Sequence, residues 1–459
     1  MENNSVEASS ESKSAIEAQV QNSEAPSPLL EPRLPLPAVI ESETVFRLAI
    51  KQILEGHGPI AIDAERASGF TYSARAYLIQ IFRRGGGLHL IDPVAVGDSP
   101  LWKELSEAVR DEEWIIHAST QDLACLREVG LEIYHLFDTE LGGRLAGQPR
   151  VGLGALVESL LGYSLAKEHS AVNWSTRPLK NEWLIYAALD VDILVDLRDA
   201  VEKLLIDSGK LEYAREEFAS ILALPPTPPR VDAWRRTSGM HRLRQRAELA
   251  IVRELWNARD RFAKEIDLAP GRVMSDDTIV LIATQKPNNF NDFAIAVTRH
   301  ARPLFVNNSA TPLSRGVKIQ RPLERWYRDY QRALDLGEEN LPAYRKESNE
   351  LPPIRVWKEK NVPAYARLTH SRAALSQISE SIKIPLENLL SPEAVRRLCW
   401  EAPQEPIEEY VSSTLSKYGA RPWQIELCAG SLIAPLGEVE PLITEVPSEE
   451  ATSNTLQEE

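Results

Sequence analysis

The sequence is poor in cysteine and has no long apolar run. Three cysteines occur in 459 residues, at positions 125, 399 and 428, without a CxxC pair. This usage predicts a reducing compartment and excludes a cysteine-ligated zinc site. No apolar run approaches about 18 residues, so no membrane-spanning helix is expected. The first residues, MENNSVEASSESKS, lack the basic and apolar regions of a signal peptide, and we therefore expect a cytoplasmic protein.

Basic residues are outnumbered over the whole chain, which has a formal net charge of −15. Much of this acidity lies near the two ends of the sequence. Residues 1–40 contain six Glu and two basic residues, and residues 437–459 contain seven Glu and no basic residue. Residues 234–304 contain thirteen Lys and Arg but only eight Asp and Glu. The total charge therefore does not exclude a nucleic-acid partner, because binding depends on the local basic surface.

Changes in composition divide the chain into five segments. Residues 1–40 and 438–459 are acidic and polar, and we expect both to be disordered. Residues 41–224 alternate between strand-like and helix-like runs, which is typical of an α/β sheet domain. The proline-rich stretch LALPPTPPR ends this domain. Only helical patterns are expected beyond it, at 225–325 and 326–437.

The two helical blocks share an order of features. Each has a long amphipathic helix, then a linker, then a short helix that opens with Ser-Asp or Ser-Pro. This order indicates a diverged repeat. Within the α/β domain, AYLIQIF and LHLIDP flank three glycines and predict a hairpin. The run NEWLIYAALDVDILVDLRDAVEKLL predicts one long helix.

Two acidic residues follow an apolar strand in the stretch PIAIDAE. Side chains at i and i+2 of a strand point to the same face, so Asp63 and Glu65 are expected side by side. Their charges repel unless a cation lies between them, and hard divalent cations prefer carboxylate oxygens. The alternative is a pair of solvated acids at a strand end.

Further acids follow in the same domain. Asp122 comes after the apolar strand EWIIHAS, although the pattern Ser-x-x-Asp also fits a helix cap. Tyr186 and Asp190 are four residues apart on a predicted helix and therefore share one face, where a core tyrosine beside a solvated acid is the alternative. Four such carboxylates could hold two divalent ions about 3.5–4 Å apart, as in sites for phosphoryl displacement. Tyr186 could then orient the attacking water.

The segment 41–224 resembles the ribonuclease D group of DEDD-type 3′-5′ exonucleases. The matching elements are DAE at 63–65, HASTQD at 117–122, FDT at 137–139, WSTRPL at 174–179 and YAALDVDIL at 186–194. The region from about 234 to 320 resembles an HRDC domain, a nucleic-acid-binding module. The resemblance implies a ribonuclease-H-like α/β domain, in which a mixed sheet is flanked by helices. It also implies two following all-α domains of the HRDC type.

The resemblance also implies a function and a set of roles. It implies a metal-dependent 3′-5′ exoribonuclease that uses two Mg²⁺ or Mn²⁺ ions and releases nucleoside 5′-monophosphates. By position, Asp63, Glu65, Asp122 and Asp190 become metal ligands, and Tyr186 orients the water. The expected substrate is RNA with a single-stranded 3′ end, such as a tRNA precursor, and a monomer is expected. The chain departs from many relatives in having Ala64 and Arg66 in place of threonine and an aromatic residue.

Basic and aromatic residues near these motifs are candidates for RNA contacts. In the α/β domain they are Arg66, Lys167, His169, Trp174, Arg177 and Lys180. In the first helical block they are Arg235, Arg242 and Arg246, within its densest basic run. Such residues could contact phosphates, although ordinary surface charges and core tryptophans are the alternative.

Two other functions are compatible with the same sequence. One is a non-catalytic RNA-binding adaptor with a decayed site, although all four acids and the tyrosine are present. The other is a DNA exonuclease of the same chemistry, because contacts to the RNA 2′-hydroxyl group cannot be located from sequence.

Overall fold

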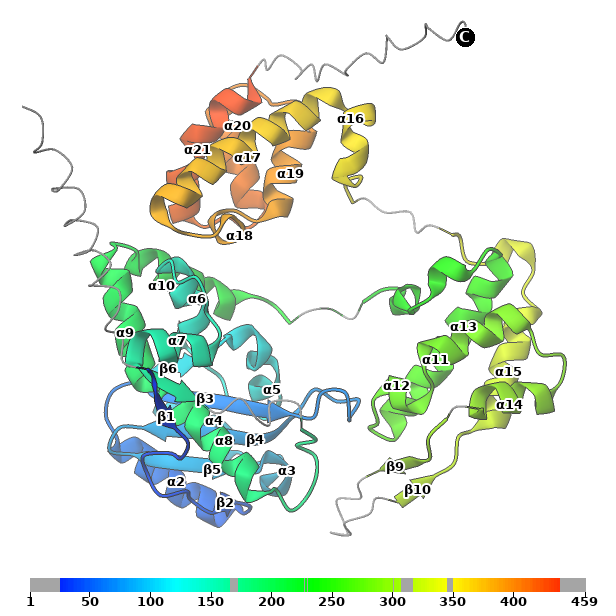
Figure 1. The fold of residues 1–459 in the computed structure, drawn as a ribbon, viewed down its shortest axis with the longest axis horizontal. Coiled ribbons are helices and arrows are strands. Elements are labelled where there is room, and N and C mark those ends of the chain that lie inside the picture. The colour runs from blue at the N-terminus through cyan, green and yellow to red at the C-terminus, as the bar shows by residue number, and fades with distance from the viewer. Residues whose placement is uncertain are drawn as a thin grey trace, which may run out of the picture. The chain divides into compact units, whose positions relative to one another are not determined.

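A computed structural model describes residues 25–165, 172–226, 228, 230–299, 301–306, 317–344 and 350–437. The chain forms two compact units, residues 1–143 with 148–347, and residues 144–147 with 348–459. The first unit contains an α/β domain and a helical domain, and the second unit is helical (Figure 1). Across these described ranges, no helix is both long enough and apolar enough to cross a membrane.

The α/β domain is built on a six-stranded sheet with the order β2-β5-β4-β3-β6-β7. The strands are β2 (Val39–Ile40), β3 (Ile60–Arg66), β4 (Ala76–Arg83), β5 (Gly87–Ile91), β6 (Glu113–Ile116) and β7 (His135–Asp138). β4 is antiparallel to both β3 and β5, whereas β6 and β7 continue the sheet in parallel. The predicted mixed sheet is thus confirmed, and β3 lies inside it with a neighbour on each side.

The predicted hairpin joins β4 and β5. Gly85 and Gly87 have φ angles of 74° and 88°, which lie in the left-handed region that glycine adopts without a steric penalty. The three consecutive glycines therefore allow a tight return of the chain. Because the hairpin pairs β5 with β4, which in turn pairs with β3, it fixes the antiparallel half of the sheet.

Helices pack around this sheet. They are α2 (Glu43–Glu55), α3 (Pro93–Val96), α4 (Leu101–Ala108), α5 (Leu123–Glu128), α6 (Thr139–Leu145), α7 (Leu153–Leu161), α8 (Asn181–Asp192), α9 (Leu194–Asp207) and α10 (Leu211–Ala223). The prediction of one long helix in the stretch NEWLIYAALDVDILVDLRDAVEKLL is wrong, since α8 ends and α9 begins around the fully buried Ile193. No glycine or proline stands at this junction. The division lets α8 pack on β3, β4 and β5 while α9 packs on β3 and β6.

The expectation that residues 1–40 are disordered is wrong for residues 25–40. β1 (Ser27–Leu29) pairs in parallel with β8 (Tyr163–Leu165), and β2 pairs with β5. Arg33 donates from its backbone N and its Nε to the buried Asp192 carboxylate, at 2.9 and 3.0 Å. The segment is therefore bound to the α/β domain by main-chain pairing and an ion pair. Residues 1–24 and 438–459 lie outside the described residues.

The first helical domain has its own apolar core. Its helices are α11 (Arg246–Glu265), α12 (Pro270–Val273), α13 (Asp276–Gln285), α14 (Phe290–Thr298) and α15 (Leu323–Leu334). Trp326 of α15 is fully buried in this core and packs edge-on against Phe262 of α11, with ring centroids 5.7 Å apart. The expected division between residues 325 and 326 falls within α15. The apolar face of that helix belongs to the first helical domain.

A short strand pair interrupts the helical pattern that was expected throughout this domain. β9 (Leu304–Val306) and β10 (Val317–Ile319) pair antiparallel, with Leu304 opposite Ile319. Leu304 is buried in the helical core. Main-chain pairing and this anchor explain why three-residue strands form here without a longer alternating pattern.

The loop after β3 contacts the first helical domain. Phe70 O accepts a hydrogen bond from Ala269 N at 3.0 Å, and Ser73 N donates to Asp267 Oδ1 at 2.8 Å. The hydroxyl of Tyr72 donates to Asp260 Oδ2 at 3.2 Å. The strand that carries Asp63 and Glu65 therefore continues into a segment with several partners in α11 and just beyond it.

The second unit is a separate set of helices. They are α16 (Trp357–Lys360), α17 (Val362–Ile382), α18 (Leu386–Leu389), α19 (Pro392–Trp400), α20 (Ile407–Lys417) and α21 (Pro422–Leu436). α17 packs against both α19 and α21. The Trp357 and Trp400 rings pack with centroids 4.8 Å apart.

We expect Trp326→Ala to destabilise the first helical domain by about 3–5 kcal/mol, because removal of a fully buried tryptophan leaves a cavity. The free energy of unfolding of the full chain, followed by tryptophan fluorescence and circular dichroism, measures this effect. Arg328→Ala on the exposed face of the same helix is the matched control and should change it by about 0.5 kcal/mol or less. Equal stabilities of the two variants would show that α15 does not belong to this core.

Candidate metal centre and nuclease site

Asp63 and Glu65 stand on one face of β3, near its C-terminal end. Ile60, Ala61 and Ile62 precede them and are fully buried, which holds the strand in the middle of the sheet. Both acids are partly buried, and Ala64 between them faces the opposite side. The alternation of the strand thus delivers two carboxylates to a single position.

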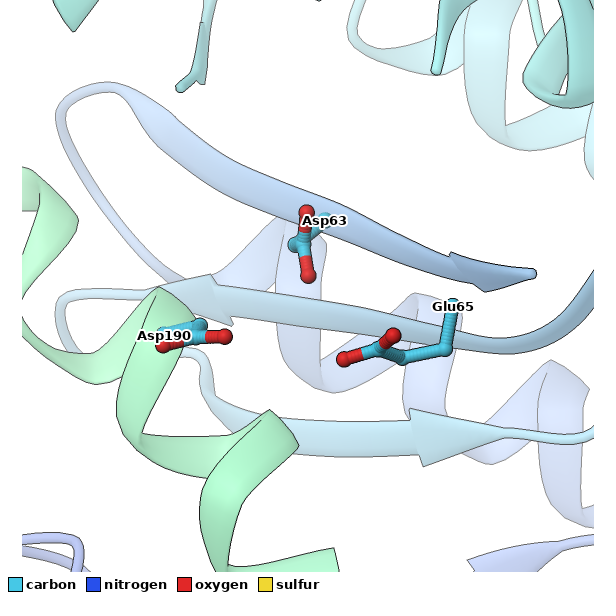
Figure 2. Close-up of side chains that lie close together, drawn as sticks. All are labelled: Asp63, Glu65 and Asp190. Carbon is cyan, nitrogen blue, oxygen red and sulfur yellow. The ribbon is translucent and has the colours of Figure 1, made fainter. Parts of the chain in front are cut away.

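α8 supplies the third carboxylate. Oxygen atoms of Asp63, Glu65 and Asp190 lie within 4.8 Å of one another. Figure 2 shows the three side chains, two from β3 and one from α8, turned toward a common space. Tyr186 lies one turn before Asp190 on the same helix, and a hydrogen bond joins the two side chains. The i, i+4 spacing in the sequence thus becomes a direct contact.

Asp122 adds a fourth carboxylate from the turn after β6. Its side chain is buried and interacts with the Asp63 carboxyl, an interaction that raises the pKa of Asp122 and lowers that of Asp63 against the larger effect of burial. Asp122 stands at the N-terminus of α5, but its side chain makes no capping hydrogen bond there. The alternative of a simple helix cap therefore does not describe its geometry.

Asp138, which the sequence reasoning missed, holds the turn that carries Asp122. Its carboxylate accepts hydrogen bonds from Ser119 N at 2.8 Å, Ser119 Oγ at 2.7 Å and Ala118 N at 3.2 Å. It also accepts from two backbone N–H groups at the start of α6. Ala118 has a φ angle of 59°, an unfavourable value for a residue other than glycine. The sequence feature that could have identified Asp138 was its position at the end of β7, within the matching element FDT.

The four carboxylates destabilise one another's charged forms. Burial raises the pKa of Glu65 to about 10, with further contributions from Asp63, Asp190 and Asp122. Burial and the charge of Asp63 raise the pKa of Asp122 to about 8. Burial likewise raises the pKa of both Asp63 and Asp190. Without added positive charge, the site therefore retains protons near neutral pH.

One cation lies beside the acids. The Nη2 atom of Arg66 is 3.3 Å from Asp122 Oδ1, and its charge lowers the pKa of Asp63, Glu65 and Asp122. Arg66 supplies one positive charge against four carboxylates. The excess negative charge of the four carboxylates and their all-oxygen donor set fit hard divalent cations.

Tyr186 remains protonated across the physiological pH range. Burial and the neighbouring carboxylates of Asp190 and Glu65 raise the pKa of its hydroxyl. It can therefore donate a hydrogen bond within the acidic site, but it cannot serve as a phenolate base.

The other residues of the α/β domain that were predicted to contact RNA interact with different parts of the domain. Trp174 is fully buried and packs against Trp183, with ring centroids 5.7 Å apart. The Arg177 guanidinium donates to Asp92 Oδ2 at 2.6 Å and to the carbonyl of Tyr77 at 2.8 Å. The Lys180 amine lies over the Trp183 ring, 5.3 Å from its centroid. Lys167 and His169 lie outside the described residues.

The basic run of the first helical domain separates into two groups. Arg235 donates to the Ala343 carbonyl at 3.0 Å, and Arg246 donates to the Pro342 carbonyl at 3.1 Å. These two side chains thus bind the segment that follows α15. Arg242 is exposed and pairs with the exposed Asp277 at 2.8 Å. The neighbouring Arg236 and Arg244 are exposed as well.

Comparison with known families agrees with this arrangement. The family described as "3'-5' exonuclease" matches residues 38–206, and the HRDC domain family matches residues 248–295. A third family, described as "3' to 5' exonuclease C-terminal domain", matches residues 350–436. The fold and the acidic centre thus define a DEDD-type 3′-5′ exonuclease, a class that uses divalent metal ions.

Sequence comparison with individual proteins shows which members of this class the chain is similar to. Ribonuclease D of Escherichia coli K12 is 27% identical over 386 residues, which are 81% of this chain and 91% of that protein. Ribonuclease D of Psychromonas ingrahamii is 30% identical over 51% of this chain, and the match spans 63% of that relative's length. The chain is thus similar to the ribonuclease D proteins, and its residues 38–206 belong to the 3′-5′ exonuclease family.

Solved structures share the fold. A crystal structure of a protein from Bifidobacterium adolescentis has a TM-score of 0.78 and 37% identity, and the match covers 90% of this chain and 99% of that one. The Escherichia coli RNase D structure has a TM-score of 0.58 at 24% identity, with 87% and 98% covered. These similarities extend over both the α/β and the helical parts of the chain.

Without metal, we expect stability to fall as pH rises from about 5 to about 9. Glu65 and Asp122 bind protons in the folded state that the unfolded chain releases, because their pKa values are raised above the ordinary range. Each such proton contributes a slope of up to about 1.4 kcal/mol per pH unit. Unfolding in EDTA at several pH values measures the slope, which Mg²⁺ should flatten.

Glu65→Gln tests the origin of that slope, because an uncharged amide removes one titrating group and keeps the shape. In EDTA, the stability of this variant should fall less steeply with pH, by the contribution of about one bound proton. Asp207→Asn, at an exposed position on α9, is the control and should leave the slope unchanged. A slope that is equal in the native chain and in Glu65→Gln would contradict the assignment.

Proposed function

We propose that this protein shortens RNA from its 3′ end with two divalent ions, Mg²⁺ or Mn²⁺, and releases nucleoside 5′-monophosphates. The observation that carries the proposal is the convergence of four acids from β3, α8 and the turn after β6 on one position. That position lies in a domain of the 3′-5′ exonuclease family.

Asp63, Glu65, Asp122 and Asp190 are the proposed ligands of the ions. When bound, the ions supply an activated water and stabilise the attacking and leaving oxygens of the phosphoryl displacement. The carboxylates hold this charge at a fixed place because β3 and α8 are both packed into the core. Their raised pKa values support the proposal, since a site that resists ionisation by itself gains most from added cations.

Tyr186 is proposed to orient the attacking water. Its hydroxyl is held by Asp190 and keeps its proton, so it can fix the direction of a water molecule by hydrogen bonding. It does not have to accept a proton in this role. Loss of the hydroxyl should therefore slow catalysis and leave metal binding unaffected.

The substrate is proposed to be RNA with a single-stranded 3′ end, such as a tRNA precursor. The solved Escherichia coli relative is described as an exoribonuclease involved in structured RNA processing. In the present chain, the exposed arginines Arg236, Arg242 and Arg244 are the proposed phosphate contacts of the first helical domain. Arg66 is the proposed contact nearest to the scissile end, because it lies beside Asp122.

The second helical unit is proposed to be a further HRDC-like domain. Both helical parts have a long helix, α11 or α17, that packs against the second helix after it and against the last helix of its own set. The second helix after the long one, α13 or α19, is capped by a serine in both, with Ser275 Oγ accepting from Thr278 N and Ser391 Oγ accepting from Ala394 N. Each long helix also carries a buried arginine, Arg259 or Arg367, that donates to a main-chain carbonyl. The match in order, cap and buried arginine supports a repeat.

The nuclease activity is tested with a 5′-labelled RNA that has an overhanging 3′ tail. The native chain should give a ladder that shortens from the 3′ end with Mg²⁺ or Mn²⁺ and no ladder with EDTA. Asp63→Asn should abolish cleavage, because the variant lacks one ligand charge. Tyr186→Phe should lower kcat by roughly 100-fold or more with unchanged Mn²⁺ affinity.

Asp207→Asn serves again as the control for substitution of an acid and should cleave like the native chain. RNA binding without cleavage by the native chain under either metal would favour the adaptor function. A preference for single-stranded DNA over RNA of the same sequence, measured in competition, would favour a DNA exonuclease.

The exposed arginines are tested by the salt dependence of RNA binding. Simultaneous replacement of Arg236, Arg242 and Arg244 by alanine should weaken binding and reduce the slope of log K against log salt by roughly 2. Each phosphate contact to a single strand contributes about 0.7 to this slope. Binding of a labelled RNA in EDTA, which prevents cleavage, measures the slope by fluorescence anisotropy.

The matched control replaces three exposed, acid-paired cations of the α/β domain, which are Arg110, Lys203 and Arg215. It removes the same number of charges and should leave the slope close to the native value. An equal reduction in both triple variants would show that net charge, rather than this basic surface, governs binding.

A further inference from the structure

Gln80 is a buried polar residue in the centre of the α/β domain. It lies in the middle of β4, and its side chain is fully buried. Among the described residues, neither its amide nitrogen nor its amide oxygen has a hydrogen-bond partner. Its neighbours Leu78, Ile79 and Ile81 are apolar and fully buried. An unpaired amide is unfavourable in such surroundings, so its presence calls for a partner that the protein itself does not supply.

The sheet register places this amide beside the metal centre. Gln80 is the cross-strand partner of Asp63 in the antiparallel β3–β4 pair, and directly opposed residues project from the same face. α8, which brings Asp190 to Asp63, also packs against β4. The Gln80 side chain is therefore enclosed on the face of the sheet that carries the four acids.

We propose that Gln80 is a positioning residue for Asp63 and acts through a bound water molecule. A buried water requires two to four polar partners. The amide nitrogen and oxygen of Gln80 supply two, and the carboxylate of Asp63 supplies a third. The amide N–H donates to the water, and the water donates to the Gln80 carbonyl and to Asp63. This hydrogen bond fixes the direction in which Asp63 presents its oxygens.

The proposal rests on the proposed function, since its consequence is the affinity of the acidic centre for metal. Groups that orient a metal ligand typically change metal affinity by about 10- to 100-fold when they are removed. Gln80→Met keeps the length and approximate shape of the side chain and removes both hydrogen-bonding atoms. The variant should therefore retain the fold and bind metal more weakly.

The experiment measures Mn²⁺ binding to the metal-free full chain without RNA, by electron paramagnetic resonance of free Mn²⁺. Gln80→Met should raise the Kd by about 10- to 100-fold. In EDTA, its thermal unfolding should occur at or above the native temperature, because an unpaired amide is replaced by an apolar group. Leu78→Met, two residues away on the same face of β4 and opposite Glu65, is the matched control and should bind Mn²⁺ like the native chain.

A double-mutant cycle tests whether Asp63 is the partner. In the Asp63→Asn background, Gln80→Met should have little further effect on Mn²⁺ affinity. Undiminished weakening in that background would overturn the assignment to Asp63. Gln80→Leu provides a second apolar variant if the methionine variant does not fold.

The outcomes separate this inference from the proposed function. Native Mn²⁺ affinity in both Gln80 variants, with or without a loss of stability, would overturn the positioning role and leave the metal centre intact. Absence of Mn²⁺ binding by the native chain would instead overturn the metal centre itself. Weaker Mn²⁺ binding in the Gln80 variants, together with native-like unfolding in EDTA, is the result that the inference requires.

Discussion

The structure of this protein has to hold four mutually repelling carboxylates together in one partly enclosed site. Burial and proximity raise the pKa of Glu65 to about 10 and that of Asp122 to about 8. A folded chain keeps such a cluster only where the surrounding packing forces it together. We propose that this repulsion is also the source of function, because divalent cations bound between the carboxylates would relieve it.

The surrounding structure opposes this repulsion from several directions. β3 is held between β4 and β6, and α8 is packed over the same face. Asp138 accepts five hydrogen bonds and thereby fixes the turn that presents Asp122. The loop after β3 is bound by Asp267 and Ala269 of the first helical domain. The acids are thus positioned by long-range contacts that their own local sequence does not contain.

The helical domain uses its arginines in two ways. Arg246 and Arg235 bind carbonyl groups of residues 342 and 343, so their charge contributes to the structure of the domain. Arg236, Arg242 and Arg244 are exposed and are the proposed phosphate contacts. Only part of a dense basic run is consequently exposed, and the count of charges in a segment overstates its accessible basic surface.

The sequence by itself determined the α/β domain, the glycine hairpin and the placement of Asp63 and Glu65 side by side, because strand alternation, helical spacing and turn chemistry are local properties. It also placed Tyr186 and Asp190 on one helix face. Only the tertiary structure decided that Asp122 bonds to Asp63, that Trp174 is a core residue and that residues 25–40 join the domain. It alone showed the hydrogen bonds of Asp138 and the burial of the Gln80 amide opposite Asp63. These features depend on contacts between segments far apart in the chain, which no local pattern specifies.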